Sequence, residues 1–284
     1  MERTIMQIPY ESPLYPKEWK SLSDPPPCLY AMGNTELLRG RLFTVVGSRH
    51  TPEQARKTCE TLTKELSERF CIVTGTADGG DSAAIRGALK GTGRVICLHA
   101  GGLDSLPQGN SALLQEVVQS GGLLLSAYPS ETPVRAFSFE YRNKLLATIS
   151  EGTLVVSAGE KSGALITAKY AMAQEKPIFA LPYFPGSAAG EGCNKLLKTG
   201  GILTENALDI TTRMGIKTEE KTRVVTLTAD EEKLLTALKT LAEGHASELA
   251  AAAGIPPFKV RAVLSALEVK GLVTALGGNR YAPV

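Results

Sequence analysis

The residues best suited to chemistry in this chain are small and basic side chains that follow short apolar runs. Gly47-Ser48-Arg49 comes at the end of the run 42–47. A glycine lets the backbone approach a ligand, a serine adds a hydroxyl, and an arginine offers a fork of donors that matches a phosphate. The triplet is therefore a candidate anion site, although the same residues also suit a tight turn with a surface arginine.

A second glycine-rich stretch, 74–81, follows the next apolar run. Its glycines are typical of a phosphate loop, but it has neither a Walker lysine nor a strict GxGxxG spacing. Asp78 and Asp81 would also repel a phosphate. The pattern therefore favours a structural role, in which Asp81 caps the alanine-rich helix that follows.

Aromatic and basic residues are interleaved near the middle of the chain. Arg142 and Lys144 flank Asn143, and Phe137 and Phe139 come just before them. Cations that hold phosphates beside aromatics that stack on bases are typical of single-strand binding. We expect Arg142 and Lys144 to bind a ligand, whereas Phe137 and Phe139 are more typical of a buried aromatic cluster.

Two further segments place small or polar residues where helices are expected to begin. Lys161-Ser162-Gly163 opens a segment of small residues that includes Thr167, so its backbone N–H groups can reach a ligand. Asn194-Lys195 is expected to add to the same rim. The candidate binding residues are therefore Gly47, Ser48, Arg49, Arg142, Asn143, Lys144, Lys161, Ser162, Gly163, Thr167, Asn194 and Lys195.

The elements that must position these residues follow from hydrophobic periodicity. Apolar runs with β-branched residues recur at 42–47, 71–75, 94–98, 122–126, 152–157 and 177–181. Such short runs are typical of strands covered on both faces, as in a parallel sheet, and the segments between them suit helices. The alternation predicts a doubly wound, mostly parallel α/β sheet. The candidate residues follow these strands, at the edge where helix N-termini favour anions.

Two segments flank this α/β pattern of residues 40–213. Residues 1–39 are rich in proline, which removes backbone donors and fixes φ. We therefore expect an arm that packs on the core as extended chain with short helical turns, anchored by Trp19 and Tyr15. The polar and charge-rich stretch 214–228 is typical of a linker.

The last segment, 229–284, is predicted to form a separate small unit. Leucine, valine and alanine recur at helical spacing in three stretches, and a Gly277-Gly278-Asn279 turn then joins two short runs. Three helices followed by a hairpin predict a winged helix-turn-helix. Cations and anions balance in this segment, whereas a duplex reader is normally distinctly basic. A protein-interaction surface or an accessory DNA surface is therefore expected.

Composition excludes several classes of protein. A net charge of +2 on 284 residues gives no strong overall attraction to polyanions, so any nucleic-acid site must be a local patch. Five scattered cysteines without a CxxC pair fit neither a disulfide framework nor a zinc site, and they indicate a reducing cytoplasm. No apolar run approaches the roughly 18 residues of a membrane span. We expect a cytoplasmic protein that needs no membrane, metal or other cofactor.

Taken together, these segments resemble the DprA/Smf DNA-processing family over about residues 15–210. Any one of the matching motifs is weak, but their occurrence in register is specific, and 229–284 resemble the winged helix that many members carry. The matching features are Tyr15-Pro16, Gly47-Ser48-Arg49, the loop from Gly75 to Asp81, Gly101-Gly102-Leu103-Asp104, Phe139 with Arg142-Asn143-Lys144, the segment 162–168, and Gly192-Cys193-Asn194.

The resemblance implies an extended Rossmann fold that binds single-stranded DNA in natural transformation, without catalytic turnover. It also implies a homodimer that protects the incoming strand and helps to load a RecA-type recombinase. The DNA contacts of the family transfer to Arg49, Arg142 and Lys144. The pairing surface is expected around Ile202-Leu203 or Leu208.

Several positions depart from the family pattern. Asp78 and Ile85 stand where the glycine loop usually has arginine and histidine. Ser157 replaces a glutamate before the Ser-Gly pair, and Tyr183 replaces a glycine after a proline. Lys144 replaces the last arginine of an Arg-Asn-Arg triplet, which keeps the charge but loses the bidentate geometry. A diverged member with a changed ligand is therefore an open alternative.

Two other functions are open from the residues. Related Rossmann-like proteins include phosphoribohydrolases that act on small nucleotides, but Pro185-Gly186-Ser187 is not their PGGxGT motif. A transcription regulator would read duplex DNA through the third helix of the winged helix. That helix offers only Lys259, Arg261 and Lys270, with Glu268 among them, which disfavours duplex reading.

Overall fold

The computed structural model describes residues 4–216 and 227–283. The chain divides into two compact units, with the division near residue 218. Most of the expected linker, 217–226, lies outside the described residues. Met214 and Ile216 pack against the core of the first unit, and Thr228 caps the first helix of the second. Within the described ranges, no helix has the length and apolar character needed to cross a membrane.

The first unit is built on a nine-stranded sheet in the order β1-β2-β6-β5-β4-β3-β7-β8-β9. The strands from β6 to β9 are parallel, whereas β1 and β2 pair antiparallel at one edge. This confirms the predicted mostly parallel, doubly wound sheet. The strands are β1 (Met6–Pro9), β2 (Cys28–Gly33), β3 (Leu42–Gly47), β4 (Cys71–Thr74), β5 (Val95–His99), β6 (Leu123–Ser126), β7 (Thr153–Ser157), β8 (Ile178–Ala180) and β9 (Ile202–Leu203).

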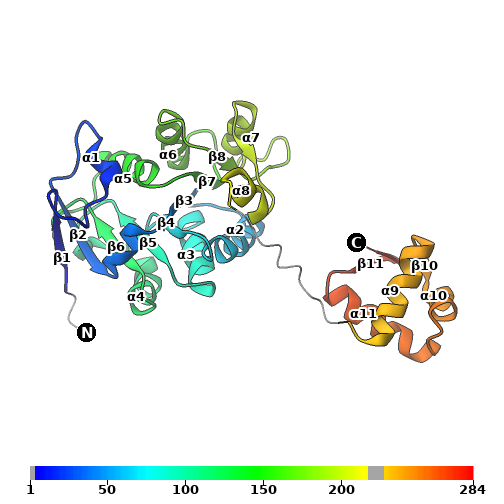
Figure 1. Ribbon diagram of the computed structural model, residues 1–284. Helices are drawn as coiled ribbons and strands as arrows, with labels where there is room; N and C mark the ends of the chain where they lie inside the picture. The colour runs from blue at the N-terminus through cyan, green and yellow to red at the C-terminus, as the bar shows by residue number, and fades with distance from the viewer. Residues whose placement is uncertain (1–3, 217–226, 284) are drawn as a thin grey trace. The chain divides into compact units, whose positions relative to one another are not determined.

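Helices cover both faces of the sheet (Figure 1), and the buried side chains form a separate apolar core on each face. One face packs against α1 (Lys17–Lys20), α5 (Ala136–Ile149), α6 (Gly163–Met172) and α7 (Glu191–Lys198). The other packs against α2 (Glu53–Leu66), α3 (Gly80–Lys90), α4 (Ser111–Gln119) and α8 (Ala207–Arg213). Burial on both faces explains why the parallel strands are continuous apolar runs.

The N-terminal segment joins the sheet, a result that the sequence did not predict. Its strands β1 and β2 extend the sheet antiparallel beyond β6. Trp19 is fully buried, and its Nε1 donates to the carbonyl oxygen of Leu145 in α5 at 2.9 Å. The Tyr15 hydroxyl donates to the carbonyl oxygen of Pro26 at 2.7 Å. Residues 6–33 are thus part of the α/β architecture rather than only an arm lying on it.

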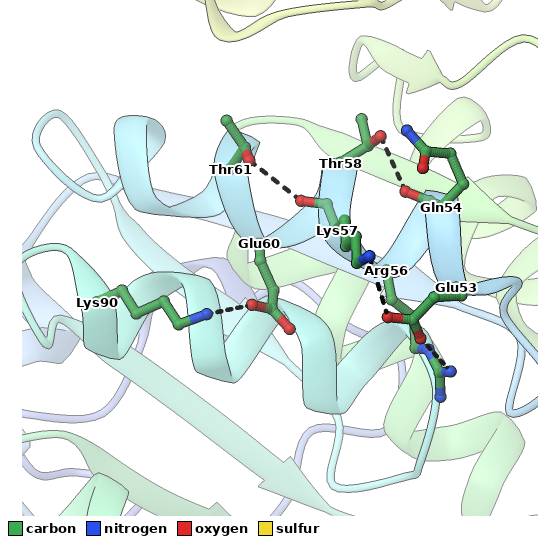
Figure 2. A network of polar contacts seen from close by, with 8 residues as sticks. All are labelled: Glu53, Gln54, Arg56, Lys57, Thr58, Glu60, Thr61 and Lys90. Atoms are coloured by element: carbon green, nitrogen blue, oxygen red, sulfur yellow. Dashed lines mark hydrogen bonds and ion pairs between the residues drawn. The ribbon is translucent and has the colours of Figure 1, made fainter. Parts of the chain in front are cut away.

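Helix α2 shows which interactions hold the helical layer in place. Cys59, Leu62 and Leu66 are buried against the sheet. On its solvent side, Glu60 pairs with Lys90 of α3, while Glu53 pairs within α2 (Figure 2). Exposed ion pairs of this kind contribute at most about 1 kcal/mol each. The apolar stripe therefore fixes the position of α2, and the charges mainly keep its outer face soluble.

The second unit is a winged helix, as predicted. It comprises α9 (Ala229–Leu241), β10 (Gly244–His245), α10 (Ala246–Ala253), α11 (Pro257–Val269), β11 (Val273–Gly277) and β12 (Arg280–Pro283). The strands form a small antiparallel sheet in the order β10-β12-β11, in which β10 was not expected. Gly254 ends α10 in the left-handed conformation at φ 64°. Leucines from all three helices form the core.

Candidate functional site

The candidate site lies where the strand order of the parallel sheet reverses. Strand β3 is flanked by β4 on one side and by β7 on the other. From β3 the chain continues through β4, β5 and β6 towards one edge of the sheet, and from β7 it continues through β8 and β9 towards the other. Loops that follow β3 and β7 therefore diverge and leave a crevice at the carboxyl edge of the sheet. This edge is where the sequence placed Gly47-Ser48-Arg49 and Ser162-Gly163.

A pocket of about 320 Å³ occupies this crevice. It gathers eight of the predicted residues from the loop after β3, from α5 and from the start of α6. The volume is at the lower end of the range of small-ligand sites. The lining residues are Val46, Gly47, Ser48, Arg49, His50, Ala77, Asp81, Phe139, Arg142, Asn143, Ser162, Gly163, Ala164 and Thr167.

Arg49 is the exposed cation of the pocket. Its guanidinium carbon lies 5.1 Å from the centre of the Phe139 ring, and Phe139 itself is half-buried. Stacking on an aromatic face holds the guanidinium plane while its N–H donors stay free for a ligand. This geometry suits a phosphate contact beside an aromatic surface.

Arg142 is buried, so it differs from an open phosphate contact. Its Nη1 donates to the carbonyl oxygen of Leu98 at 2.9 Å, and its Nε donates to Oδ1 of Asn143 at 3.0 Å. The Asn143 Nδ2 in turn donates to the carbonyl oxygen of Gly163 at 3.1 Å. Burial lowers the pKa of Arg142, and the nearby Asp81 opposes that shift. Arg142 thus ties α5 to β5 and, through Asn143, to α6.

Asp81 is a pocket residue whose role the sequence did not reveal. Helix α3 begins at Gly80 after Gly79, which has φ 77°, so the predicted N-cap role of Asp81 is wrong. Its carboxylate is buried beside Arg142 and accepts from the Ala77 N–H at 3.4 Å. Burial raises the pKa of this carboxyl, while Arg142 works against the rise. The pocket therefore combines two arginines with one desolvated carboxyl group.

The start of α6 supplies the polar groups on the opposite wall. Ser162 caps the helix by accepting from the Ala164 N–H at 3.3 Å. The Thr167 hydroxyl is fully buried and has no hydrogen-bond partner in the part of the chain that the structure describes. A helix N-terminus carries a partial positive charge, so this wall favours an anionic group.

Close backbone contact explains the glycines of the two loops. A Cβ at Gly80 would lie 2.4 Å from the Cα of Gly47, and a Cβ at Gly47 would lie 2.9 Å from the Cα of Gly80. The loop after β3 therefore touches the first turn of α3, and any side chain at either position would separate them.

Four predicted residues do not line the pocket. Lys144 forms an ion pair with Asp24 of the N-terminal segment. Asn194 exchanges two hydrogen bonds with the backbone of Tyr183, so it holds the loop after β8. Lys161 and Lys195 are exposed. Contact of Lys161 and Lys195 with a ligand stays a prediction.

The prediction of a buried aromatic cluster was wrong for both phenylalanines, since Phe139 is only half-buried. Phe137 lies in the first turn of α5 and is 62% exposed, so it belongs to no buried cluster. Phe139, two residues later, lines the pocket. Successive helical positions point in different directions, which the residue types alone could not reveal.

Residues that depart from the family pattern mostly make internal contacts. Asp78 is exposed outside the pocket lining, and Ile85 is buried in α3. Ser157 accepts from the Ser48 N–H at 3.1 Å, and the Tyr183 hydroxyl donates to the carbonyl oxygen of Val156 at 2.7 Å. Ser157 and Tyr183 therefore support the loops around the crevice, and none of the four residues lines the pocket.

The comparisons with known proteins agree with this architecture. Residues 6–215 match the family described as DNA recombination-mediator protein A, and residues 218–279 match the DprA winged helix domain. The DNA processing protein DprA of Bacillus subtilis is 35% identical over 211 residues, which cover 74% of this chain and 71% of that protein.

Two solved structures have a similar fold. DprA from Streptococcus pneumoniae matches with a TM-score of 0.69 and 29% identity, over 76% of each chain. DNA processing protein A from Helicobacter pylori matches with a TM-score of 0.68 and 29% identity, over 75% of this chain and 96% of that one. The work on the latter describes its single-stranded DNA binding mode. The present chain belongs to the DNA recombination-mediator protein A family of DNA-processing proteins.

Proposed function

We propose that this protein binds single-stranded DNA at the pocket between β3 and β7, without turning it over. The observation that carries the proposal is the convergence of Arg49, the start of α6 and the half-buried Phe139 on one pocket. Cations and helix N-termini hold phosphates, while an aromatic surface accepts bases of any sequence. The related protein from Helicobacter pylori, which has a described single-stranded DNA binding mode, supports the same conclusion.

Within this proposal the pocket residues have different tasks. Arg49 holds a backbone phosphate at the mouth, with its guanidinium over the Phe139 ring. The Gly163 N–H and the Thr167 hydroxyl hold an oxygen of the same or the next phosphate. Arg142 positions Asn143 and α6 from below through its bonds to Leu98 and Asn143. Asp81 limits the positive charge of the pocket, which suits the single charge of each phosphodiester.

The test is a fluorescence titration of a labelled oligo-dT strand with Arg49→Ala. Loss of a charge-assisted hydrogen bond to phosphate costs about 1.5–3 kcal/mol, so affinity should fall roughly 10- to 100-fold. The matched control is Arg39→Ala, because Arg39 is an exposed arginine that precedes β3 at the opposite edge of the sheet. Equal affinities of the two variants, or release of free base from a nucleoside monophosphate, would contradict the proposal.

The cellular role that we propose is protection of incoming strands in the cytoplasm during natural transformation, and help in loading a RecA-type recombinase. Membership of the family supports this role. The protein should slow nuclease digestion of single strands and speed recombinase assembly on strands covered by a single-strand-binding protein. Arg49→Ala should weaken both effects in parallel, since both would start from the same bound strand.

We also propose that the protein acts as a homodimer. Leu203 on the edge strand β9 and Leu208 on α8 are 51% and 52% exposed, which supports the surface suggested by the sequence. Leu203→Glu would put a charge at that surface and should yield monomers in sedimentation velocity. The control is Leu276→Glu, a leucine of equal exposure in the winged helix.

A further inference from the structure

The exposed face of α11 carries an unusual set of side chains for the third helix of a winged helix-turn-helix. Phe258 and Val269, at the two ends of the helix, are 81% and 90% exposed. Ala262 and Ser265 are exposed residues on the same side of the helix, and the charged Lys259, Arg261 and Glu268 are exposed on its flanks. Since the four positions are spaced by four, three and four residues, they form one stripe along the helix. The opposite face is buried in the core of the unit.

This stripe does not suit duplex DNA. A helix that reads a major groove presents basic and polar groups to phosphates and base edges. Within the stripe the two largest side chains are apolar and the two between them are small, while the charged residues of α11 lie on its flanks. Single exposed apolar residues are normal on a protein surface, but two on one stripe with a small-residue centre make a surface for another helix.

The order of the stripe is self-complementary. About the midpoint of the stripe, between residues 263 and 264, Phe258 and Val269 lie equally far away, and Ala262 and Ser265 lie equally close. A two-fold axis through that midpoint, with the helices antiparallel, would set Phe258 against the partner's Val269. The small residues would face one another in the centre, where they let the helix axes approach. A two-fold symmetric interface requires this kind of pairing, in which one residue contacts a second residue of the partner and that second residue contacts the partner's copy of the first.

The charges on one flank of the stripe are complementary in the same arrangement. Arg261 and Glu268 are both exposed and lie on the same side of the stripe at helical spacing. The two-fold axis would bring Arg261 close to the partner's Glu268, and the reverse pair would form at the other end. In the described part of the unit, the Nη2 of Arg261 donates to a neutral acceptor, Oδ1 of Asn279, at 3.2 Å. A carboxylate is a stronger acceptor for it.

The other flank offers no comparable attraction. There Lys259 would approach the partner's Ala266 and the partner's Lys270. Within the unit, Lys270 is paired with Glu231 at 2.6 Å, which reduces the repulsion between the two lysines. The contact therefore depends on the apolar stripe and on the Arg261 flank.

We propose that α11 binds α11 of a second copy of this chain, antiparallel and about a two-fold axis. Four side chains per copy bury less than the roughly 800 Å² per partner of a standard stable interface. The contact is therefore weak between free molecules, and it becomes populated when two copies are held close together, which raises the effective concentration. The inference rests on the winged helix and does not depend on DNA binding at the pocket.

Disulfide trapping in the full-length protein tests the arrangement. Ala262→Cys places a thiol near its symmetry mate in the centre of the contact, whereas the control Thr236→Cys places one on the exposed side of α9. The parent protein gives the background, since four native cysteines are buried and Cys28 is half-buried. Under mild oxidation, the intermolecular disulfide should form at least tenfold faster at 262 than at 236. Equal rates would overturn the proposal, because a dimer formed elsewhere would assist both variants alike.

A charge exchange in the Ala262→Cys background tests the register. Arg261→Glu should slow the cross-link about tenfold, because it puts like charges opposite each other. Adding Glu268→Arg should restore the rate, because the pair is re-formed with its signs reversed. All of these positions are exposed, so circular dichroism should show unchanged folding. A double variant that stays as slow as Arg261→Glu would refute the antiparallel pairing.

Discussion

Removing the indole of Trp19 tests whether the N-terminal segment is an integral layer of the α/β unit. Trp19 of α1 is fully buried, and its Nε1 donates to the carbonyl oxygen of Leu145 in α5 at 2.9 Å. Truncating a buried tryptophan to alanine costs about 3–5 kcal/mol, which includes the cavity that remains. For a unit of this size, 1 kcal/mol corresponds to about 2–4 °C in Tm, so Trp19→Ala should lower Tm by roughly 6–20 °C.

Scanning calorimetry provides the assay, because the chain divides into two compact units and we expect each to give its own unfolding transition. Only the transition of the α/β unit should move, and that of the winged helix serves as an internal reference. Lys17→Ala, at an exposed position on the same short helix, is the control and should change stability by less than about 0.5 kcal/mol.

Fluorescence gives an independent check on the wild-type protein, since Trp19 is its one tryptophan. Its emission should shift in the same urea transition as the circular dichroism of the α/β unit. A shift at much lower urea, or a Tm loss below about 2 °C in Trp19→Ala, would show a detachable arm and refute the reasoning.

Three further predictions concern the pocket and its surroundings. In Gly80→Ala the new Cβ would lie 2.4 Å from the Cα of Gly47, so oligo-dT binding should weaken more than tenfold and the free energy of urea unfolding should fall by about 1–3 kcal/mol. The control is Gly109→Ala, whose Cβ would have nothing within 4 Å and should leave affinity and stability unchanged. Burial, together with the nearby Arg142, lowers the pKa of His99 to about 4 in the folded protein. As the pH falls, the unfolded chain therefore protonates His99 before the folded protein does. The free energy of unfolding should then decrease between about pH 6.5 and pH 4, by at most about 3 kcal/mol. Melting curves of His99→Gln should lack that component, while the opposite contribution of Asp81, whose pKa is raised, stays in both proteins. Lys144→Ala should change oligo-dT affinity less than twofold, because its ammonium is already paired with Asp24, and a tenfold loss would place DNA outside the pocket.

The parallel strands could be predicted from sequence because burial on both faces leaves an unambiguous apolar run. Strands β1 and β2 lacked that signal. They lie at the edge of the sheet, where Met6 is 49% exposed and a proline ends β1, so their pairing depends on β6 far along the chain. Residue types near the N-terminus therefore indicated only an extended segment.

Residue types also identified most of the pocket but not the direction of each side chain. Arg142 and Lys144 are two residues apart on α5, and such positions point to different sides of a helix. One therefore faces the pocket and the other faces Asp24. The role of Asp81 was missed because Gly79 adopts a positive φ, which shifts the start of α3 and turns the carboxylate inward beside Arg142.

The most direct test of the central claim is the salt dependence of oligo-dT binding by the wild-type protein and Arg49→Ala. For single strands, the slope of log affinity against log salt is about −0.7 per phosphate neutralised, so contacts from the exposed Arg49, Lys161 and Lys195 predict a slope of about −2. We expect this slope for the wild type, a slope shallower by about 0.7 for Arg49→Ala, and poor competition by duplex DNA. A slope near zero, or an identical slope for both proteins, would contradict binding of single-stranded DNA at the pocket between β3 and β7.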